Sequence, residues 1–173
     1  MKLLILVDNK NAIAKDGEQI LFVDNDLEMF KEYTTNNIIV MGRHTLDAIG
    51  RQLPNRISVV FTRSNREDKK DLFYVDSIEK LENIMKKYPD KEVFVIGGAE
   101  IVKLLWERID ELIVTRVETV VEGADTFIPD FKDFELLDKS EIFDPNYRVY
   151  HEKWKRKKWK FYLLKMKKNF WKL

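Results

Sequence analysis

Residues 38–62 read IIVMGRHTLDAIGRQLPNRISVVFT, and this stretch decides the fold of the chain. Two continuous apolar runs, 38–41 and 57–62, enclose a glycine turn and a short helix that we expect over 42–49. Strands that are apolar on both faces are typical of a parallel sheet covered by helices on each side. The stretch therefore predicts an α/β unit in which a buried strand leads directly into the start of a helix.

The turn at Gly42 has the features of an anion site. Glycine lets the backbone approach a ligand closely, and Arg43, His44 and Thr45 follow at a helix start, where free N–H groups favour anions. Further along, the planar guanidinium of Arg56 could hold a carboxylate through two parallel hydrogen bonds. We therefore expect a phosphate at one end of this stretch and a carboxylate at the other, although His44 alone could simply be solvated or capped.

The rest of the chain continues the alternation of strands and helices. Apolar segments predict strands at 2–7, 72–75, 92–96 and 110–118, and residues 134–143 and 147–154 are expected to be two final strands in an antiparallel hairpin. Amphipathic spacing predicts helices at 24–34, 76–88 and 99–108, the second opening with Asp76 and Glu79 at capping-box spacing. Residues 8–17 and 122–129 are expected to be loops. This order predicts one α/β domain with a mainly parallel central sheet, helices on both faces and an antiparallel C-terminal edge strand.

A second strand delivers glycines to a helix. Gly97 and Gly98 follow the strand at 92–96 and precede Ala99, which repeats the arrangement at Gly42. Two such junctions suggest one extended cofactor between them, whereas paired glycines taken alone would indicate only a tight turn. The chain has no GxGxxG, so the fingerprint of an ordinary dinucleotide-binding domain is absent.

One carboxylate stands beside an apolar helical face. Asp24, Asn25 or Asp26 can cap the helix at 24–34, and Asp26 lies in its first turn near Phe30. Taken alone, Asp26 could merely complement the helix dipole. Thr115, in the strand at 110–118, would likewise be read as a β-branched strand residue.

Size and composition exclude several classes of protein. The 173 residues, 45% hydrophobic and 35% charged, suit one globular domain rather than a disordered chain. The chain has no cysteine, which excludes disulfides, thiolate zinc sites and thiol nucleophiles, and no metal site is predicted. MKLLILV at the N-terminus lacks a cleavage region and is read as a strand, not a signal peptide. We expect a cytoplasmic protein.

Five segments in a fixed order resemble dihydrofolate reductases. They are MGRHT at 41–45, IGRQLPNR at 49–56, FTR at 61–63, IGGAEI at 96–101 and EGADTFIP at 122–129. The resemblance covers residues 1–157 and implies a single-domain dihydrofolate-reductase-like fold. It also implies NADPH-dependent reduction of 7,8-dihydrofolate to 5,6,7,8-tetrahydrofolate. One alternative is a reductase of the riboflavin-biosynthesis type acting on a ribosylamino-pyrimidine, which Asp26 and Arg56 disfavour. The other is a weakly active homologue whose basic C-terminal tail binds a membrane or another partner.

The resemblance assigns roles on the substrate side. Asp26 would bind the N3 and 2-amino edge of the pterin and promote its protonation, and Thr115 would hydrogen-bond the same groups. Leu21 occupies a catalytic position in the loop over the site, and Arg56 would bind the glutamate carboxylate. The apolar substrate contacts would be Leu6, Leu27, Phe30, Ile49, Leu53 and Ile96.

The resemblance also assigns a cofactor site. Arg63, near the adenosine ribose, suits a 2′-phosphate and so favours NADPH over NADH, although alone it could be a solvated surface charge. The cofactor contacts would be Leu6, Ile13, Gly42, Arg43, His44, Thr45, Thr62, Arg63, Ile96, Gly97, Gly98, Ala99, Glu100 and Ile101.

The chain departs from the family pattern around the pterin. Ile20 and Leu21 stand where the family usually has proline and tryptophan, and leucine has no indole N–H to hold a water. Leu6 stands where a small residue usually lines the pocket, and it could crowd the ring. The phosphate-binding segments are intact, so cofactor binding is the better supported expectation.

The C-terminal tail, residues 158–173, continues beyond the resemblance. Residues 153–173 hold ten basic and no acidic residues, so the preceding body is net acidic. Apolar residues recur at helical spacing in the tail, namely Trp159, Leu163, Met166, Phe170 and Leu173. A basic amphipathic helix is typical of weak membrane-surface contact or a partner helix. Packing on the chain's own acidic body and fraying are the alternatives. We expect a monomer that binds no nucleic acid.

Overall fold

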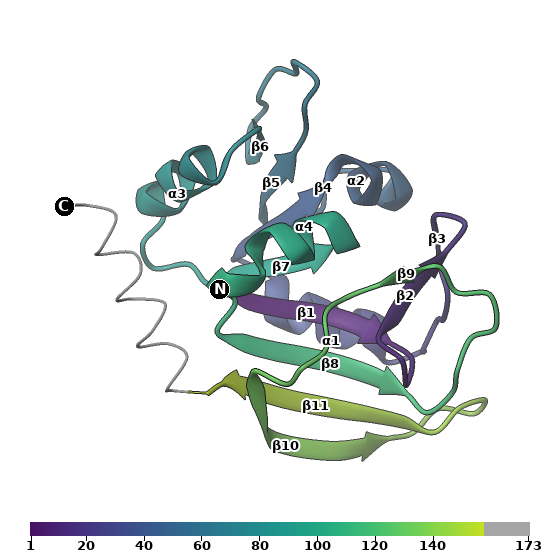
Figure 1. Cartoon of the computed structure of the whole chain (residues 1–173). Coiled ribbons are helices and arrows are strands. Elements are labelled where there is room, and N and C mark those ends of the chain that lie inside the picture. Colours follow the sequence, from purple (N-terminus) through teal and green to yellow (C-terminus); the bar gives the residue numbers. More distant parts are fainter. Residues whose placement is uncertain (158–173) are drawn as a thin grey trace.

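The computed structural model describes residues 1–157 and shows an eight-stranded sheet flanked by helices (Figure 1). The strand order is β10-β11-β8-β1-β7-β4-β5-β6. The strands are β1 (Lys2–Val7), β4 (Ile38–Gly42), β5 (Ile57–Phe61), β6 (Leu72–Val75), β7 (Val93–Gly97), β8 (Glu111–Val117), β10 (Phe134–Ile142) and β11 (Val149–Arg156).

Pairing in this sheet is parallel from β8 to β6. β11 runs antiparallel to both β8 and β10, so the C-terminal hairpin closes this side of the sheet. The predicted fold class is therefore confirmed, with the detail that β10 forms the edge and β11 lies between it and β8.

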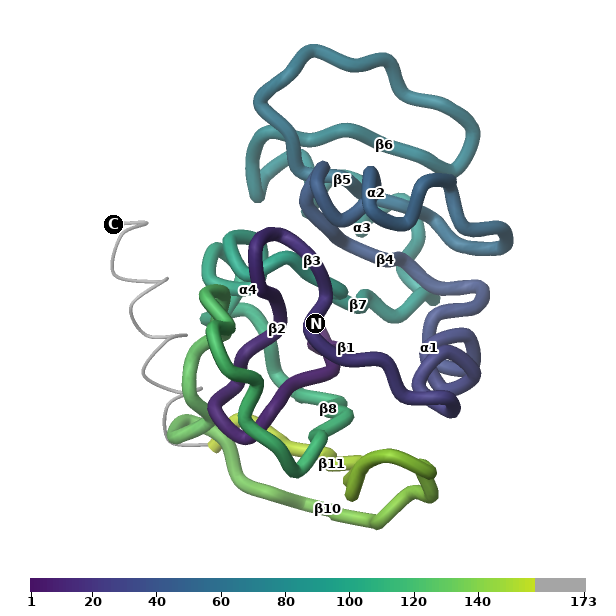
Figure 2. Tube along the Cα trace, turned by 90° about the vertical axis from the view of Figure 1, so that its right-hand side faces the viewer, coloured from purple at the N-terminus to yellow at the C-terminus, as the bar shows by residue number. Residues whose placement is uncertain are grey.

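Within residues 1–157, helices cover both faces of the sheet, two on each. On one face, α1 (Asp26–Thr34) and α2 (Arg43–Ile49) pack against apolar side chains of the central strands. On the other face, α3 (Ile78–Lys87) and α4 (Ala99–Leu105) cover the larger core, and a 3-10 turn, η1 (Trp106–Arg108), continues α4. Figure 2 shows α1 and α4 on opposite sides of β1 and β7.

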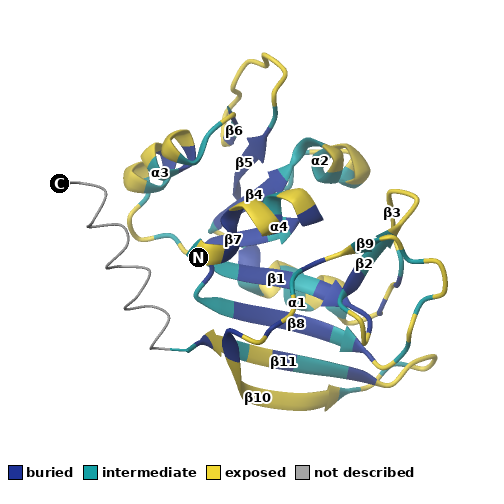
Figure 3. Ribbon diagram, viewed as in Figure 1, coloured by how far each residue is buried: buried dark blue, intermediate teal, exposed yellow. Residues whose placement is uncertain are grey.

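Burial explains why the strands differ in composition. Every residue of β5, and every residue of β4 before Gly42, is buried, as expected for strands covered on both faces. In β10, seven consecutive residues are exposed, and most of the strand has the colour of exposed residues (Figure 3). Charges along an exposed edge strand oppose pairing with other chains.

Three local predictions were wrong. Residues 8–17 are not simply a loop, because β2 (Ala12–Lys15) pairs with β3 (Glu18–Gln19) and with β9 (Thr126–Phe127) in a second, three-stranded sheet. The loop expected at 122–129 thus supplies a strand to a partner more than one hundred residues away. The capping box at Asp76 does not form: Ser77 caps α3 by accepting a bond from the Lys80 backbone N–H at 3.3 Å.

Asp8 holds the segment after β1 in place. Its buried carboxylate accepts backbone hydrogen bonds from Lys10 at 2.7 Å, Ala12 at 2.9 Å and Val121 at 3.0 Å. A buried carboxylate needs such partners, and here they join the end of β1, the start of β2 and the connection after β8. The small sheet is thereby fixed to the large one.

Within residues 1–157, no helix is both long enough and apolar enough to cross a membrane. The amphipathic helix predicted for 158–173 lies outside the described residues.

Candidate active site

The predicted site residues gather where the parallel strands end. β1, β4, β5, β7 and β8 run in the same direction, so their carboxyl ends share one edge of the sheet. In open α/β sheets, ligands bind beyond this edge. Two groups of predicted residues lie along it, one between α1 and β8 and the other at the starts of α2 and α4.

Asp26 and Thr115 form the polar centre of the first group. Asp26 is the first residue of α1, and its Oδ1 accepts a 2.6 Å hydrogen bond from the hydroxyl of Thr115 on β8. Thr115 is fully buried, whereas Asp26 is half-buried. These residues are 89 positions apart in the chain, and the fold brings them into direct contact.

The protonation of Asp26 depends on its surroundings. Burial raises the pKa of this carboxyl, while the hydrogen bond from Thr115 and the charge of His151 act in the opposite direction. A carboxylate in such a place can hold an N–H edge of a ring and stabilise positive charge on it.

A continuous apolar surface extends from α1 to α2. Phe30 and Ile96 both pack against one apolar cluster of the sheet, and Ile49, Leu53 and Ile96 pack against a second. Ile96 therefore joins the predicted substrate contacts of both helices. Leu27 is 60% exposed and lies outside these clusters, at the rim.

Arg56 is held rigidly beside the end of α1. Its Nε donates to Thr34 Oγ1 at 3.1 Å, and its Nη1 donates to the Pro54 carbonyl at 2.7 Å. Burial lowers the pKa of the guanidinium, which nevertheless remains charged at neutral pH. The second terminal nitrogen makes no bond to another residue of the described chain, so it can serve a ligand carboxylate.

The two glycine junctions lie side by side. Met41 pairs with Gly97 across β4 and β7, and a methyl group added to Gly42 would come within 3.1 Å of Ile101 Cγ1. Methyl groups at Gly97 and Gly98 would lie 3.8 and 3.7 Å from Thr45 Oγ1. Gly97 has φ +119°, a conformation that favours glycine. Backbone and a hydroxyl thus line a cradle where side chains would intrude, which fits a phosphate-bearing cofactor.

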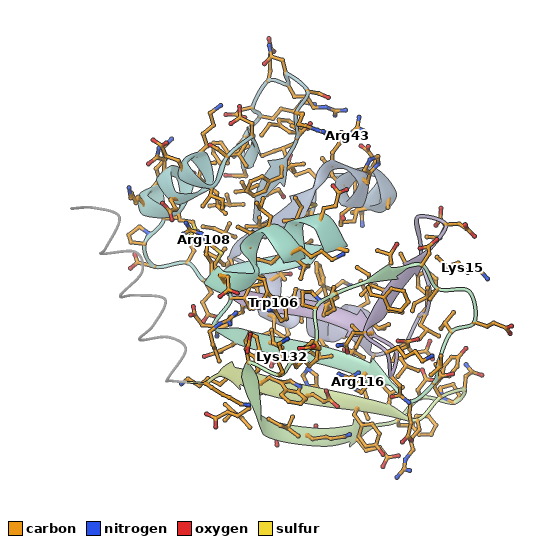
Figure 4. All side chains as sticks on the ribbon, in the orientation of Figure 1. Lys15, Arg43, Trp106, Arg108, Arg116 and Lys132 are labelled. Carbon is orange, nitrogen blue, oxygen red and sulfur yellow. The ribbon has the colours of Figure 1, made fainter. Side chains whose placement is uncertain are left out.

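The remaining predicted cofactor contacts surround this cradle. Arg43 begins α2, well separated from Arg116 on β8 (Figure 4). Thr62 and Arg63 follow β5, with Arg63 exposed, while Ile13 on β2 packs partly against the main core. In α4, Ala99 is buried and Glu100 is exposed.

The sequence model of the dihydrofolate reductase family matches residues 1–156. The chain belongs to the dihydrofolate reductase family. The dihydrofolate reductase of Haemophilus influenzae is 29% identical over 156 residues, which cover 85% of this chain and 95% of the relative. That of Bacillus subtilis is 34% identical over 128 residues, 74% of each chain. The structure of the Enterococcus faecalis dihydrofolate reductase complexed with NADP(H) and RAB-propyl has a TM-score of 0.78 at 31% identity, covering 90% of this chain and 95% of that one.

Membership of the dihydrofolate reductase family makes this chain an NADPH-dependent oxidoreductase that reduces dihydrofolate to tetrahydrofolate. Family membership thus favours dihydrofolate reduction over the alternative of a riboflavin-biosynthesis reductase. The phosphate cradle and the apolar surface agree with the two ligands of this reaction.

Leu6 and Leu21 are both buried, and Leu6 pairs directly with Thr115 across β1 and β8. The two residues are 8% and 6% exposed, and they belong to one apolar cluster with Val23, Val117 and Val149. The residue at the usual tryptophan position of a dihydrofolate reductase and the residue at the usual small position therefore belong to the same apolar cluster.

Sequence reasoning overlooked His151 on β11. It lies directly opposite Thr115 in the pairing of β11 with β8. The alternation of Val149 and His151 places both residues on one face of the strand. It was a weak signal, because a local pattern does not show which strand lies next to β11. The hollow of about 340 Å³ lined by Arg116, Phe131 and Trp154 is unrelated to the site: Arg116 follows Thr115 in β8 and so faces the other side of the sheet.

Proposed function

We propose that this reductase binds the pterin ring of dihydrofolate between α1 and β8, and NADPH across the starts of α2 and α4. The observation that carries the proposal is the hydrogen bond between Thr115 and Asp26 at the carboxyl edge of the sheet. It fixes a half-buried carboxylate at the start of α1, the helix whose Phe30 packs, like Ile96, against one apolar cluster of the sheet. Such a carboxylate recognises a planar ring that offers adjacent N–H groups.

The chain's own groups position the reactants and handle charge. NADPH, when bound, supplies a hydride to C6 of the pterin, and a proton from solvent completes the reduction at N5. Asp26 binds N3 and the 2-amino group and stabilises the protonated ring electrostatically. Thr115 holds the carboxylate in orientation. The apolar walls exclude water and hold the pterin in a fixed pose.

Arg56 and the glycine cradle hold the two ends of the ligands. The free terminal nitrogen of Arg56 binds the carboxylate of the glutamate tail, and its other two bonds fix the direction of the fork. Gly97, Gly98 and Thr45 take the pyrophosphate region through backbone N–H groups and a hydroxyl. Arg63 takes the 2′-phosphate.

The direct test is the loss of NADPH absorbance when dihydrofolate is added to the purified protein. We expect the full chain and a truncated chain ending at Lys157 to turn over at rates equal within about twofold, because the described domain closes with Arg156 in β11. Arg156 is buried and donates to the carbonyls of Ile109 and Trp106. NADPH that is bound but not oxidised would contradict the proposal.

We also propose that the enzyme is a cytoplasmic monomer and that its tail supplies any contact with membranes. All proposed site residues lie within residues 1–157 of one chain, so a monomer would hold a whole site. The same pair of proteins tests the tail on anionic vesicles: the full chain should co-sediment and the truncated chain should not. Equal behaviour of the two proteins on vesicles would reject a membrane role for residues 158–173.

The shared cluster of Leu6 and Leu21 leads to a prediction about the loop that carries Leu21 in place of tryptophan. Leu21→Trp alone should destabilise the fold by about 1–3 kcal/mol, because an added ring overfills a packed cluster. Combined with Leu6→Ala, the indole has room and can hold a water. We expect kcat of the double variant to rise about tenfold, a modest part of the ~10²–10⁴-fold typical of assisted proton transfer.

Leu6→Ala alone is the control for this prediction. It creates space without adding an N–H group, so its kcat should not rise. A double variant no faster than Leu6→Ala would show that the missing indole does not limit turnover.

A further inference from the structure

His151 lies on the same face of the sheet as the substrate-binding carboxylate. It pairs directly with Thr115, which pairs in turn with Leu6, so the three side chains form one row across β11, β8 and β1. Directly paired residues of neighbouring strands project from the same face. The ring of His151 also meets the ring of Tyr33 on α1, with centroids 6.3 Å apart and planes at 61°. The imidazole therefore lies against α1 on this face of the sheet, and the residue is partly buried.

One ring nitrogen of His151 is left without a partner. Its Nε2 is buried and has no hydrogen bond to any other residue of the described chain. A buried polar nitrogen without a hydrogen bond costs free energy, and a neutral imidazole always has one donor and one acceptor nitrogen. A phenylalanine could fill the same space without this cost. The presence of a titratable ring at position 151 therefore needs a functional explanation.

The charges around His151 are mostly acidic. The ionisable groups that face it come from α1, from β10 and from its own strand: Asp26, Glu32 and Tyr33, then Asp138, then Lys153. Three of these are carboxylates and one is an ammonium group. Two of the carboxylates are on exposed residues, so Asp26 is the one least screened by water.

We propose that His151 is a positioning residue that couples its own protonation to the charge of Asp26, so that the imidazolium keeps the substrate-binding carboxylate ionised as the pH falls. The inference rests on the proposed role of Asp26 in binding the pterin. His151 does not touch the substrate; it acts through Asp26 and beside Thr115.

The directions of the pKa shifts of His151 and Asp26 agree with this coupling. Burial lowers the pKa of His151, as does Lys153, while Asp26, Asp138 and Glu32 oppose that change. Burial raises the pKa of Asp26, and His151 opposes that change. Burial therefore moves the two titrations toward each other, from ordinary values of 6.5 and 3.8, and we expect His151 to bind its proton at the higher pH. The protonation of each group therefore affects the pKa of the other.

The test is an NMR titration of the ligand-free full chain, following the Asp26 carboxyl carbon and the histidine rings. The chain has only two histidines, so His151 is readily assigned. In His151→Gln, the pKa of Asp26 should rise by about 0.5–1 unit, below the ~1–3 units that an opposite charge produces in close contact. In Asp26→Asn, the pKa of His151 should fall by the same amount, because linkage is reciprocal.

Two further variants separate charge from packing. His151→Phe keeps an aromatic ring against Tyr33 but carries no charge, so it should shift the Asp26 titration as much as His151→Gln does. Lys153→Gln, two residues along the same face, should raise the pKa of His151 instead. In kinetics, the acid limb of kcat/KM for dihydrofolate should move to higher pH in both His151 variants.

An Asp26 titration that is identical in the wild type and in both His151 variants would overturn the inference. The titrations use no substrate. They would therefore decide the coupling even if dihydrofolate proved not to be reduced, a result that would instead overturn the proposed function.

Discussion

Asp26→Asn is expected to lower kcat/KM for dihydrofolate by about 10²–10³-fold, the equivalent of roughly 3–4 kcal/mol of transition-state stabilisation. The amide oxygen can still accept the hydrogen bond from Thr115, so the local geometry persists. The lost element is the negative charge that binds N3 and the amino group and favours the protonated ring. Steady-state kinetics with NADPH in excess measures the effect.

Thr115→Val is the matched control for Asp26→Asn. It removes the hydroxyl but leaves the carboxylate charge and nearly the same volume, so we expect a loss of only about tenfold, as for a single hydrogen bond to a charged group. NADPH affinity, measured by fluorescence quenching, should be unchanged in both variants. Equal losses in kcat/KM for the two variants would show that orientation, not charge, is what Asp26 supplies.

Asp26→Asn should also make the fold more stable at neutral pH. The pKa of Asp26 is raised by burial above its ordinary value of 3.8, so the ionised form costs stability in the folded chain. That cost is fully present above the folded pKa and disappears as the pH falls below the unfolded value. Urea unfolding should therefore show Asp26→Asn more stable than wild type at pH 7, with the difference vanishing near pH 3.

Gly97→Ala should raise the Kd for NADPH by about tenfold or more. Gly97 has φ +119°, where a residue with a Cβ is strained by about 1–3 kcal/mol, and the added methyl would point toward Thr45 in the cradle. The backbone can relieve that strain only by moving away from the position in which it meets the cofactor. Fluorescence titration with NADPH measures the change.

Gly50→Ala provides the control for the cofactor cradle. Gly50 ends α2 with φ +77°, and nothing lies within 4 Å of its missing Cβ. The substitution should lower the free energy of unfolding by about 1 kcal/mol and leave the Kd for NADPH unchanged. A similar loss of NADPH affinity in both variants would mean that general destabilisation, rather than the cradle, explains Gly97.

The sequence by itself determined the elements whose signals are local. Apolar runs such as Ile38–Met41 predicted strands covered on both faces, and the glycines at 42 and 97–98 predicted where the chain approaches a ligand. These predictions succeed because burial on both faces and φ freedom leave their mark on consecutive residues. The order of the family segments then indicated the reaction.

Tertiary structure alone decided which distant residues meet. The register of β8 against β11 places His151 opposite Thr115, and one apolar cluster brings together Leu6 and Leu21. β2 pairs with β9 although their residues read as loops. Each of these contacts joins segments far apart in the chain, and its free energy depends on register and packing rather than on local periodicity. A local pattern identifies the face that a residue occupies, but only the folded sheet determines its neighbour across that face.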